Sequence, residues 1–371
     1  MRALVAAIEV LVRPTLFRSP RSLIVHIAAS IAPLCVNRMR LARRLSRYSS
    51  PALRNQQADI DVVLRPQNKA DHHLVAMARD RDRISIACAA PMLSQHFVTL
   101  SSRIYPAFVV LAGMPMERLA FIADLSDGEA SGPGIVSFCS SDPHAILIPD
   151  HGFVVSRGYE AYRRFARSST NGWRSRSDVI LWRGSATGTG AITKAQLTAR
   201  DPDLRPRVRL CLAMKDVPMA DVKISGIAQS SNAALDRERL SAAGILGEYS
   251  SPIFWFGCKF AIDIDGNSNA WSNLIMRLLT GCCVLKVASP GGYRQWYYNK
   301  LQPWIHFVPV RSDLSDLIEQ IAWCRANLDV CEHIAASGQA LALSLDFKSE
   351  MAGSIQRICD AANAGNLRTT I

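Results

Sequence analysis

Glycine and polar residues gather in one short segment of the sequence, "WRGSATGTG" at 182–190. Because glycine has no side chain, its backbone N–H group can come close to an anion. Arg183 and Ser185 add a cationic donor and a hydroxyl donor beside them. This combination predicts contact with a phosphate-bearing ligand. The glycines of the segment are Gly184, Gly188 and Gly190.

The segment matches neither of two familiar phosphate-binding motifs. No Gly-Lys-Ser/Thr follows it, so it is not a Walker loop, and no third glycine follows Gly190, so it is not a dinucleotide fingerprint. A flexible turn is the alternative interpretation, and the surrounding sequence has to decide between the two.

The elements around this segment predict a parallel α/β sheet. Apolar runs at 179–184, 259–266, 282–287 and 304–310 have the length and composition of buried strands. Between the second and third runs, apolar residues fall on one helical face and Gly281 suits the C-terminal cap. A strand, a helix and a strand at this spacing form a βαβ unit.

Ligands of open α/β sheets bind beyond the carboxyl ends of the strands. This rule places "RGSATG", "DIDGNS" and "ASPGGY" around one crevice. Two amphipathic helices are expected after it. The first is expected to start at Ser312 or Asp313, and the second from the capping-box pattern at 329–332.

The first half of the chain also predicts an α/β sheet. Short apolar runs bounded by turn residues are interpreted as strands: "RISIACA", "FVVLAG", "LAFIADLSDG", "GIVSFCSS" and "HAILIPDHG". The polar, basic and breaker-rich stretch 164–178 is the predicted domain boundary.

Composition narrows the class of protein without settling it. The 371 residues suggest two domains, and 49% hydrophobic residues can fill their cores. A formal charge of +12 favours nucleic acid, an acidic membrane or a phosphate-bearing ligand as partner. The ten cysteines contain no C-x-x-C and His72-His73 has no ligand spacing, so we expect a reducing compartment and no metal site.

The N-terminal residues suggest contact with a membrane surface but no crossing of it. The first apolar run is interrupted by Glu9 and lacks a cleavage site, and the run at 22–36 is too short to span a bilayer. The basic stretch at 37–47 follows, with Arg38, Arg40, Arg43, Arg44 and Arg47. Such a segment lies on an anionic membrane or forms an ordinary exposed helix, and the sequence leaves both open.

The run "QPWIHFVPVRSDLS" at 302–315 is the most specific pattern in the chain. Together with "WRGS", "RPRVR", "CKFAIDIDG" and "GCCVLKV" in this order, it resembles glycosyltransferase family 90. That family includes Rumi-type protein O-glucosyltransferases, fungal capsule xylosyltransferases (the CAP10 domain) and bacterial lipopolysaccharide-modifying members. The resemblance is strong over 175–345, weaker over 117–160 and absent from the first 80 residues.

The resemblance implies a GT-B-like α/β fold, with two Rossmann-type domains facing a central cleft. It further implies a UDP-sugar donor held mainly by the C-terminal domain and an inverting transfer that needs no metal or other cofactor. Such a transfer requires a base for the acceptor hydroxyl and positive groups for the departing diphosphate. For Arg207, the nearby Arg209 is an alternative that would point the same way from a strand. The implied donor-binding residues are Arg183, Gly184, Ser185, Arg207, Lys259, Asp265, Gly266 and Ser272.

Two departures from the family pattern concern the donor site. Rumi-type members carry an arginine in the helix after the equivalent of Gly266, where this chain has Ser272 and Asn273, with Arg277 a turn later. Eukaryotic members have arginine at the position of Asp265. The leaving-group contacts and the sugar specificity of the family therefore do not transfer directly.

The catalytic base is expected in the turn that ends "LAFIADLSDGEAS" at 119–131. The family's base is an aspartate at the matching strand end. Asp127 is the first choice for it, Asp124 the second and Asp150 the third. The alternative interpretation is a plain turn built on one of these carboxylates.

These expectations combine into a UDP-sugar-dependent glycosyltransferase that acts on a hydroxyl of a bacterial envelope glycan such as lipopolysaccharide. The expected location is the cytoplasm, peripheral at the inner membrane. A non-catalytic sugar-nucleotide-binding member is the alternative; a nucleic-acid-binding protein is disfavoured because the arginines do not interleave with aromatic residues. The predicted divisions are a basic helical segment 1–60, an acceptor-side domain 61–175, a nucleotide-sugar domain 176–345 and a C-terminal helix 346–371 that packs back on the N-terminal domain.

Overall fold

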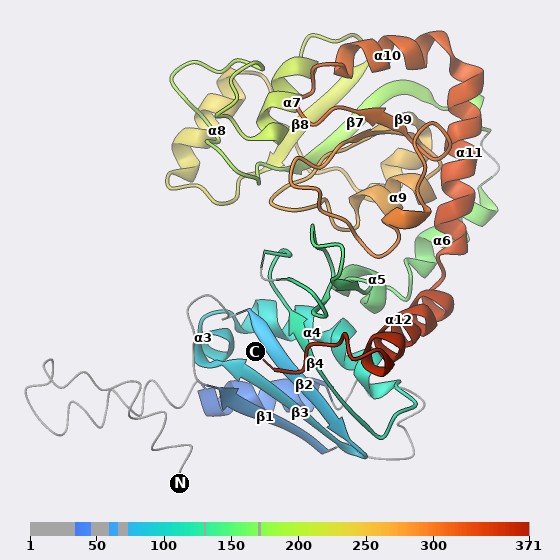
Figure 1. Ribbon diagram of the computed structural model, residues 1–371. Coiled ribbons are helices and arrows are strands. Elements are labelled where there is room, and N and C mark those ends of the chain that lie inside the picture. Colours follow the sequence, from blue (N-terminus) through green and yellow to red (C-terminus); the bar gives the residue numbers. More distant parts are fainter. Residues whose placement is uncertain (1–33, 46–58, 66–72, 130, 170–171, 371) are drawn as a thin grey trace, which may run out of the picture. The chain divides into compact units, whose positions relative to one another are not determined.

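The chain folds into two compact units, each with its own sheet (Figure 1). The computed structural model describes residues 34–45, 59–65, 73–129, 131–169 and 172–370. Described residues up to Phe138, together with Asp142–His151 and Met351 onward, form the N-terminal unit. Cys139–Ser141 and Gly152–Glu350 form the C-terminal unit.

The N-terminal unit contains a mixed six-stranded sheet in the order β1-β3-β2-β4-β5-β6. β2 runs antiparallel to both of its neighbours, and the other pairs are parallel. The strands are β1 Asp59–Arg65, β2 Leu74–Asp80, β3 Arg83–Ala89, β4 Arg118–Asp124, β5 Val136–Ser137 and β6 Ile146–Leu147. The helices that begin in or pack within this unit are residues 34–45, α3 Ala90–Ser94, α4 Phe97–Ala112, α5 His151–Val155 and α12 Phe347–Asn363.

One predicted strand of this unit is a helix. The run at 108–113 belongs to the end of α4, not to the sheet. Leu100, Ile104, Phe108 and Leu111 are all fully buried, and their spacing of three and four residues puts them on one helical face. The strand interpretation was wrong because it used only the last apolar stretch of a longer helical pattern.

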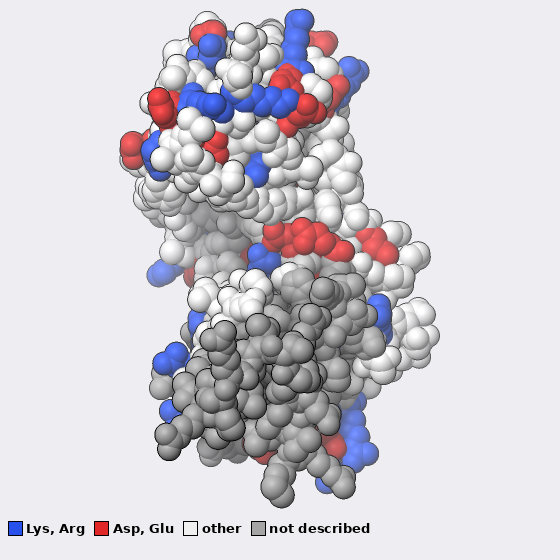
Figure 2. All heavy atoms as spheres, turned by 90° about the vertical axis from the view of Figure 1, so that its left-hand side faces the viewer, with Lys and Arg blue, Asp and Glu red and all other residues white. Residues whose placement is uncertain are grey.

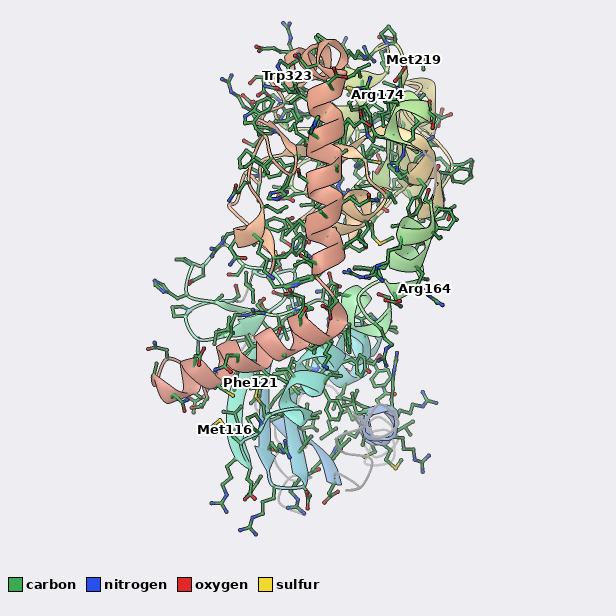
Figure 3. All side chains as sticks on the ribbon, turned by 90° about the vertical axis from the view of Figure 1, so that its right-hand side faces the viewer. Met116, Phe121, Arg164, Arg174, Met219 and Trp323 are labelled. Atoms are coloured by element: carbon green, nitrogen blue, oxygen red, sulfur yellow. The ribbon has the colours of Figure 1, made fainter. Side chains whose placement is uncertain are left out.

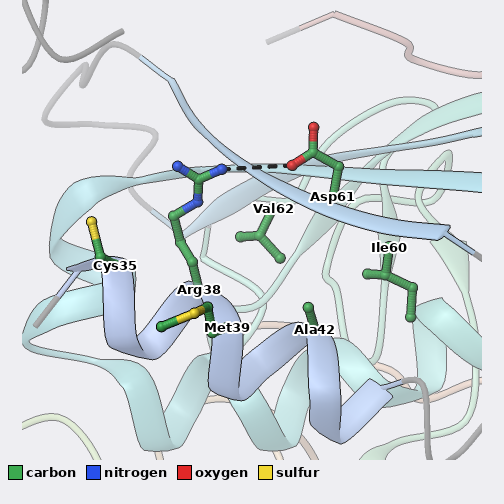
Figure 4. Close-up of a pocket in the computed structure, with 7 residues that line it drawn as sticks. All are labelled: Cys35, Arg38, Met39, Ala42, Ile60, Asp61 and Val62. Atoms are coloured by element: carbon green, nitrogen blue, oxygen red, sulfur yellow. Dashed lines mark ion pairs between the residues drawn. The ribbon is translucent and has the colours of Figure 1, made fainter. Parts of the chain in front are cut away.

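The helix at 34–45 is part of the N-terminal unit. Leu41 and Leu45 are fully buried, and the Arg44 guanidinium donates to the Ser101 hydroxyl at 3.1 Å. A pocket of about 290 Å³ lies between this helix and β1, and there Arg38 forms an ion pair with Asp61 at 3.6 Å (Figure 4). These contacts favour the ordinary domain helix of the two alternatives. Residues 1–33 and Arg47, also part of the predicted membrane segment, lie outside the described residues, as does His72.

No helix among the described ranges is long and apolar enough to cross a bilayer.

The C-terminal unit contains a fully parallel five-stranded sheet in the order β11-β10-β9-β7-β8. Counted along the chain, this is the order 2-1-3-4-5 of doubly wound folds, with the order reversing between β7 and β9. The strands are β7 Ser177–Ser185, β8 Ala220–Gly226, β9 Cys258–Asp263, β10 Cys283–Val287 and β11 Val308–Val310. An apolar core joins this sheet to α7, α10 and the start of α11.

The helices of the C-terminal unit connect successive strands or extend from the sheet. Figure 3 shows Trp323 of α10 and Arg174 near one end of the long helix α11. Arg174 donates to Asp329 and Glu332 in the first turns of that helix. The helices are α6 Glu160–Ser168, α7 Pro206–Met214, α8 Ala233–Ala242, α9 Asn273–Leu279, α10 Leu317–Ala326 and α11 Leu328–Ser344, with short 3₁₀ turns η3 Trp173–Ser175, η4 Pro252–Gly257 and η5 Tyr298–Lys300.

The two helices that follow β11 begin at residues other than the predicted ones. α10 begins at Leu317, after the cap residue Asp316, because residues 311–315 form a turn with Leu314 at a φ of 66°. α11 begins one residue before Asp329, which pairs with Arg174 instead of capping the helix. Both predicted helices exist, and only their first turns were misplaced.

The chain enters the C-terminal unit at Gly152, earlier than the predicted boundary in 164–178. Helix α6 belongs to this unit because its buried Arg163 donates to the carbonyls of Leu343 and Leu345. The chain returns to the N-terminal unit at Met351, where Ile355 of α12 lies against Gly113.

Candidate functional site

The reversal of strand order in the C-terminal sheet creates the candidate site. β7 ends at Ser185 and β9 ends at Asp263, and these two strands are neighbours. Loop 186–190 follows β7 and loop 264–272 follows β9, so the two loops begin side by side at the carboxyl ends of these strands. At such a point, connections diverge to opposite faces of the sheet and leave room for a ligand.

Arg207, near the start of α7, clamps the two loops together. Its Nη1 donates to the Ser185 carbonyl at 3.1 Å and to Thr187 Oγ1 at 2.9 Å. Its Nε and Nη2 donate to the carbonyls of Asp265 and Ile264, each at 3.1 Å. Burial lowers the pKa of the guanidinium, with Asp263 and Asp265 opposing the effect. Arg207 therefore positions the loops and keeps a positive charge beneath them.

Arg209, the alternative to Arg207, points elsewhere. Both residues lie in a helix and not in a strand, so residues two apart face nearly opposite directions. Arg209 donates to the carbonyls of Ala199 and Asp313. The structure assigns the contact with the two loops to Arg207.

Glycines let the two loops touch. Gly188 adopts a φ of 123°, and its N–H donates to Asn267 Oδ1 at 3.1 Å. A Cβ on Gly266 would lie 2.5 Å from Thr187 Oγ1. Any larger residue at either position would push the loops apart.

Two buried aspartates mark the end of β9. Asp263 is fully buried and accepts from Lys286 Nζ at 3.1 Å and from Asn273 Nδ2 at 2.7 Å. Asp265 is only 7% exposed, yet neither of its carboxylate oxygens has a hydrogen-bond partner in the described part of the chain. Burial raises the pKa of Asp265 to about 6, against the opposing effects of Lys286 and of the Ser289 hydroxyl, which lies close by without hydrogen-bond geometry.

Lys286 of β10 is the site residue that the sequence predictions missed. Its side chain is 9% exposed, and Nζ lies 4.6 Å from the centroid of the Tyr298 ring. The signal was present, because a lysine inside the apolar run "CCVLKV" has to find a buried partner. That partner is Asp263.

Arg183 does not direct its charge to the loops. Its Nη2 donates to Asp221 Oδ2 at 2.7 Å, and its Nη1 and Nε donate to the carbonyls of Asp221 and Glu248. Its guanidinium thus ties β7 to β8. Ser185 and Gly184 do lie at the strand end.

Lys259 lies at the opposite end of the sheet. It is the second residue of β9, so roughly 13 Å of strand separates it from Asp263. Its Nζ donates to Asp178 Oδ1 and sits 5.6 Å from the Trp173 ring centroid. The structure does not bring Lys259 together with the other predicted donor-binding residues.

Helix α9 does not supply the arginine of Rumi-type members. Ser272 precedes the helix and makes no capping hydrogen bond with its side chain. Arg277 is buried and stacks on Trp255, with its Cζ 3.4 Å from the ring centroid, and burial lowers its pKa to about 10. The departure noted in the sequence is therefore not compensated by Arg277.

The candidate bases of the N-terminal unit differ in how far they are exposed to solvent. Asp124 ends β4, is fully buried and accepts from the Ser126 N–H at 2.7 Å, and burial raises its pKa. Asp127 has an 18% exposed side chain and an ion pair with Arg103 at 2.7 Å. Gly128 follows at a φ of 100°. Asp150 is buried.

A parallel sheet with a reversed strand order, clamped loops and an unsatisfied carboxylate describes an α/β protein with a ligand site at one sheet edge. The sequence model of glycosyl transferase family 90 matches residues 122–349, which is more than half of the chain. The chain belongs to glycosyl transferase family 90. The predicted α/β fold of two units is confirmed.

Several characterised and uncharacterised proteins are similar to this chain. Rat protein O-glucosyltransferase 3 is 30% identical over 57% of this chain and 38% of its own length, and the human protein of that name is 28% identical over 64% and 42%. Uncharacterized protein 027R of frog virus 3 is 31% identical over 57% of this chain and 23% of its own. The chain thus spans less than half of these relatives.

Among solved structures, a glycosyltransferase from Rickettsia africae shares 10% identity over 87% of this chain and 81% of its own, with a TM-score of 0.38. The C-terminal domain of a glycosyl transferase group 1 family protein from Francisella tularensis shares 12% identity over 48% and 93%, with a TM-score of 0.32.

Proposed function

We propose that this protein transfers a sugar from a UDP-sugar to an acceptor hydroxyl, with the donor bound at the two loops of the C-terminal unit. Membership of glycosyl transferase family 90 supports transfer of a glycosyl group. The name of the rat and human relatives supports an O-linked product.

The observation that carries the proposal is the unsatisfied carboxylate of Asp265. A buried acceptor without a donor costs free energy unless a ligand supplies one. Sugar nucleotides carry several hydroxyl groups that can donate to it. Asp265 would therefore hold a ribose or sugar hydroxyl, while Lys286 and Arg207 keep positive charge at the end of the sheet where the diphosphate is expected.

The transfer itself needs one proton acceptor. The acceptor oxygen attacks the anomeric carbon from the face opposite UDP, the bond from that carbon to the diphosphate oxygen breaks, and UDP leaves with the bonding electrons. This single displacement inverts the anomeric centre and, in our proposal, uses no metal. We assign the acceptor's proton to Asp127, because its side chain is partly exposed while that of Asp124 is fully buried.

Thermal shifts with UDP, GDP, UDP-glucose, UDP-xylose and UDP-galactose test the donor. Ligand at a hundred times its dissociation constant should stabilise the protein by about 2.7 kcal/mol. Asp265→Asn should lose at least ten-fold in affinity for the preferred UDP-sugar, while Asp216→Asn, at an exposed aspartate after α7, should not. The proposal fails if no UDP-sugar shifts the transition, or if both variants bind like the wild type.

The acceptor is a further part of the proposal and rests on the sequence resemblance. We propose a hydroxyl of an envelope glycan such as lipopolysaccharide, reached by a protein held at an anionic membrane through its basic N-terminal residues. Salt-sensitive binding to anionic vesicles, lost when the arginines at 38–47 are replaced by glutamine, would support the membrane contact. Transfer to a protein acceptor instead would contradict the glycan.

A non-catalytic donor-binding protein is the second candidate. It is favoured by Arg277, which is stacked on Trp255 and does not replace the arginine of the Rumi-type helix. Tight binding of a UDP-sugar without release of UDP in the presence of any acceptor or of water would favour this candidate.

A further inference from the structure

Three cysteines from three different elements meet in the core of the C-terminal unit. Cys283 begins β10, Cys324 lies in α10 and Cys331 lies in the first turn of α11. Their sulfur atoms all lie within 4.8 Å of one another. None of the three residues is more than 2% exposed.

The three cysteines lie within the apolar core of the C-terminal unit. The Cys331 thiol donates to the Cys324 carbonyl oxygen at 3.6 Å. The neighbouring core residues are apolar, so a thiolate there has to be compensated by a cation or by donors. Free cysteines in apolar cores usually stand alone, whereas these converge on one point.

We propose that Cys283, Cys324 and Cys331 bind one Zn²⁺ ion. Zinc lies about 2.3 Å from each thiolate sulfur. In tetrahedral or trigonal geometry, that distance places the sulfurs roughly 3.8–4.0 Å apart. The cluster reaches this separation by shifts of less than about 1 Å for each side chain.

Charge favours a divalent ion over a monovalent one. Binding releases the thiol protons, and Zn²⁺ then offsets two of the three negative charges. A hard ion such as Mg²⁺ prefers oxygen ligands and is excluded by the same three sulfurs.

The ion would be structural and independent of sugar transfer. Cys283 is at the amino end of β10, roughly 13 Å along the strand from the carboxyl end that faces the loops. The ion would join this strand to α10 and α11, whose connection is the single residue Asn327. The inference does not depend on the proposed function, and its tests do not use activity.

Metal content and cobalt spectra test the site. Protein produced with added zinc, reduced and then dialysed, should retain about one zinc ion per chain by elemental mass spectrometry. Metal-free protein titrated with Co²⁺ should show an intense thiolate-to-cobalt absorption in the near ultraviolet, saturating at one equivalent. Zinc should then displace the cobalt and remove the absorption.

Cys324→Ala and Cys331→Ala should each lower zinc affinity at least a hundred-fold. Cys211→Ala is the matched control, because Cys211 is fully buried in the same core but outside the cluster. Folded, reduced wild-type protein without bound zinc and without the cobalt absorption would overturn the inference. So would equal loss in the Cys211 variant, or a disulfide between two of the three cysteines.

Discussion

The Asp265 carboxyl should make donor binding depend on pH. Its pKa of about 6 in the free protein means that the proton must leave before the carboxylate accepts a ligand hydroxyl. Affinity for the UDP-sugar should therefore be constant above pH 7 and fall up to ten-fold per pH unit below about 6. Calorimetric titrations from pH 5 to 7.5 measure this, and the profile of Asp265→Asn should be flat over that range.

The same raised pKa predicts the direction of the effect on stability. An acid with a higher pKa in the folded state binds more protons than the unfolded chain between about pH 4 and 6. The free protein should thus gain stability at this residue as the pH falls through that window, the opposite of an ion-paired aspartate. A wild-type profile parallel to that of Asp265→Asn would contradict the shift.

Asp127 should control turnover without controlling donor affinity. A positioned base contributes about 10²- to 10⁴-fold to a rate. Asp127→Asn should cost that much in UDP release with acceptor present, while UDP-sugar affinity stays within two-fold. Asp124→Asn is the comparison, because Asp124 is buried behind the turn. Normal turnover in the Asp127 variant with an inactive Asp124 variant would move the base to Asp124.

Arg183 should matter for stability more than for the donor. Its hydrogen bonds to Asp221 and to the Glu248 carbonyl hold β7 and β8 together, and Asp221 is 45% exposed. After allowance for solvent screening, Arg183→Ala should cost about 1–2 kcal/mol in chemical denaturation. UDP affinity should change less than three-fold. A ten-fold loss of affinity with unchanged stability would restore the donor contact predicted from the sequence.

The loops after β7 and β9 depend as a pair on Arg207. Lysine cannot reproduce four hydrogen bonds from a planar guanidinium, so Arg207→Lys should release both loops. UDP-sugar affinity should fall at least ten-fold, and amide hydrogen exchange should rise in both 186–190 and 264–270. Arg209→Lys is the matched control on the same helix. Faster exchange in only one loop would show that Arg207 does not couple them.

Elements buried on both faces could be predicted from the sequence, and the direction of individual side chains could not. β7, β9 and β10 appear as continuous apolar runs because helices cover the parallel sheet. The family resemblance gave both Lys259 and Asp265 a role in donor binding. The two residues lie near opposite ends of β9, however, so the length of the strand keeps them apart. Arg183 shows the second difficulty: its carbonyl partners on β8 and in the 248 loop depend on tertiary contacts that no local pattern encodes.

The cysteine cluster also could not be predicted from local sequence patterns. Metal-site patterns in sequences rely on ligands a few residues apart, and Cys283 is 41 residues before Cys324. Only the packing of α10 and α11 against β10 brings the three sulfurs together. Spacing alone therefore predicted no metal site.

The molecule as a whole should unfold in two steps, because each unit has its own sheet and core. A saturating UDP-sugar should raise the midpoint of one calorimetric transition. Leu41→Ala opens a cavity in the N-terminal unit and should reduce the unfolding free energy of that unit by about 2–4 kcal/mol. The midpoint of the other transition should fall as a result. Met39→Ala on the same helix, at a 54% exposed side chain, should have little effect. A single transition that moves in both experiments would contradict independent units.

The positive side chains of the C-terminal unit are dispersed among negative ones. On the face shown in Figure 2, Lys and Arg of this unit stand beside Asp and Glu instead of forming a continuous basic field. Arg174 pairs with Asp329 and Glu332, and Lys194 with Asp201 and Asp203. This pattern suits a protein that binds a small anionic ligand in a defined site more than one that follows a nucleic-acid backbone.

The return of the chain to the N-terminal unit affects the order in which the two units can complete their folds during synthesis. Ile122 in β4 donates to the Arg368 carbonyl, and the Arg368 N–H donates to the Gly134 carbonyl. The unit that leaves the ribosome first therefore lacks α12 and these bonds until more than two hundred further residues have been synthesised. During that interval the C-terminal unit can fold, because its sheet is complete. In the N-terminal unit, the contacts of Gly113 with Ile355 and of Met114 with Cys359 cannot form until α12 has been synthesised. Nascent chains are thus expected to need protection at the first unit and not at the second.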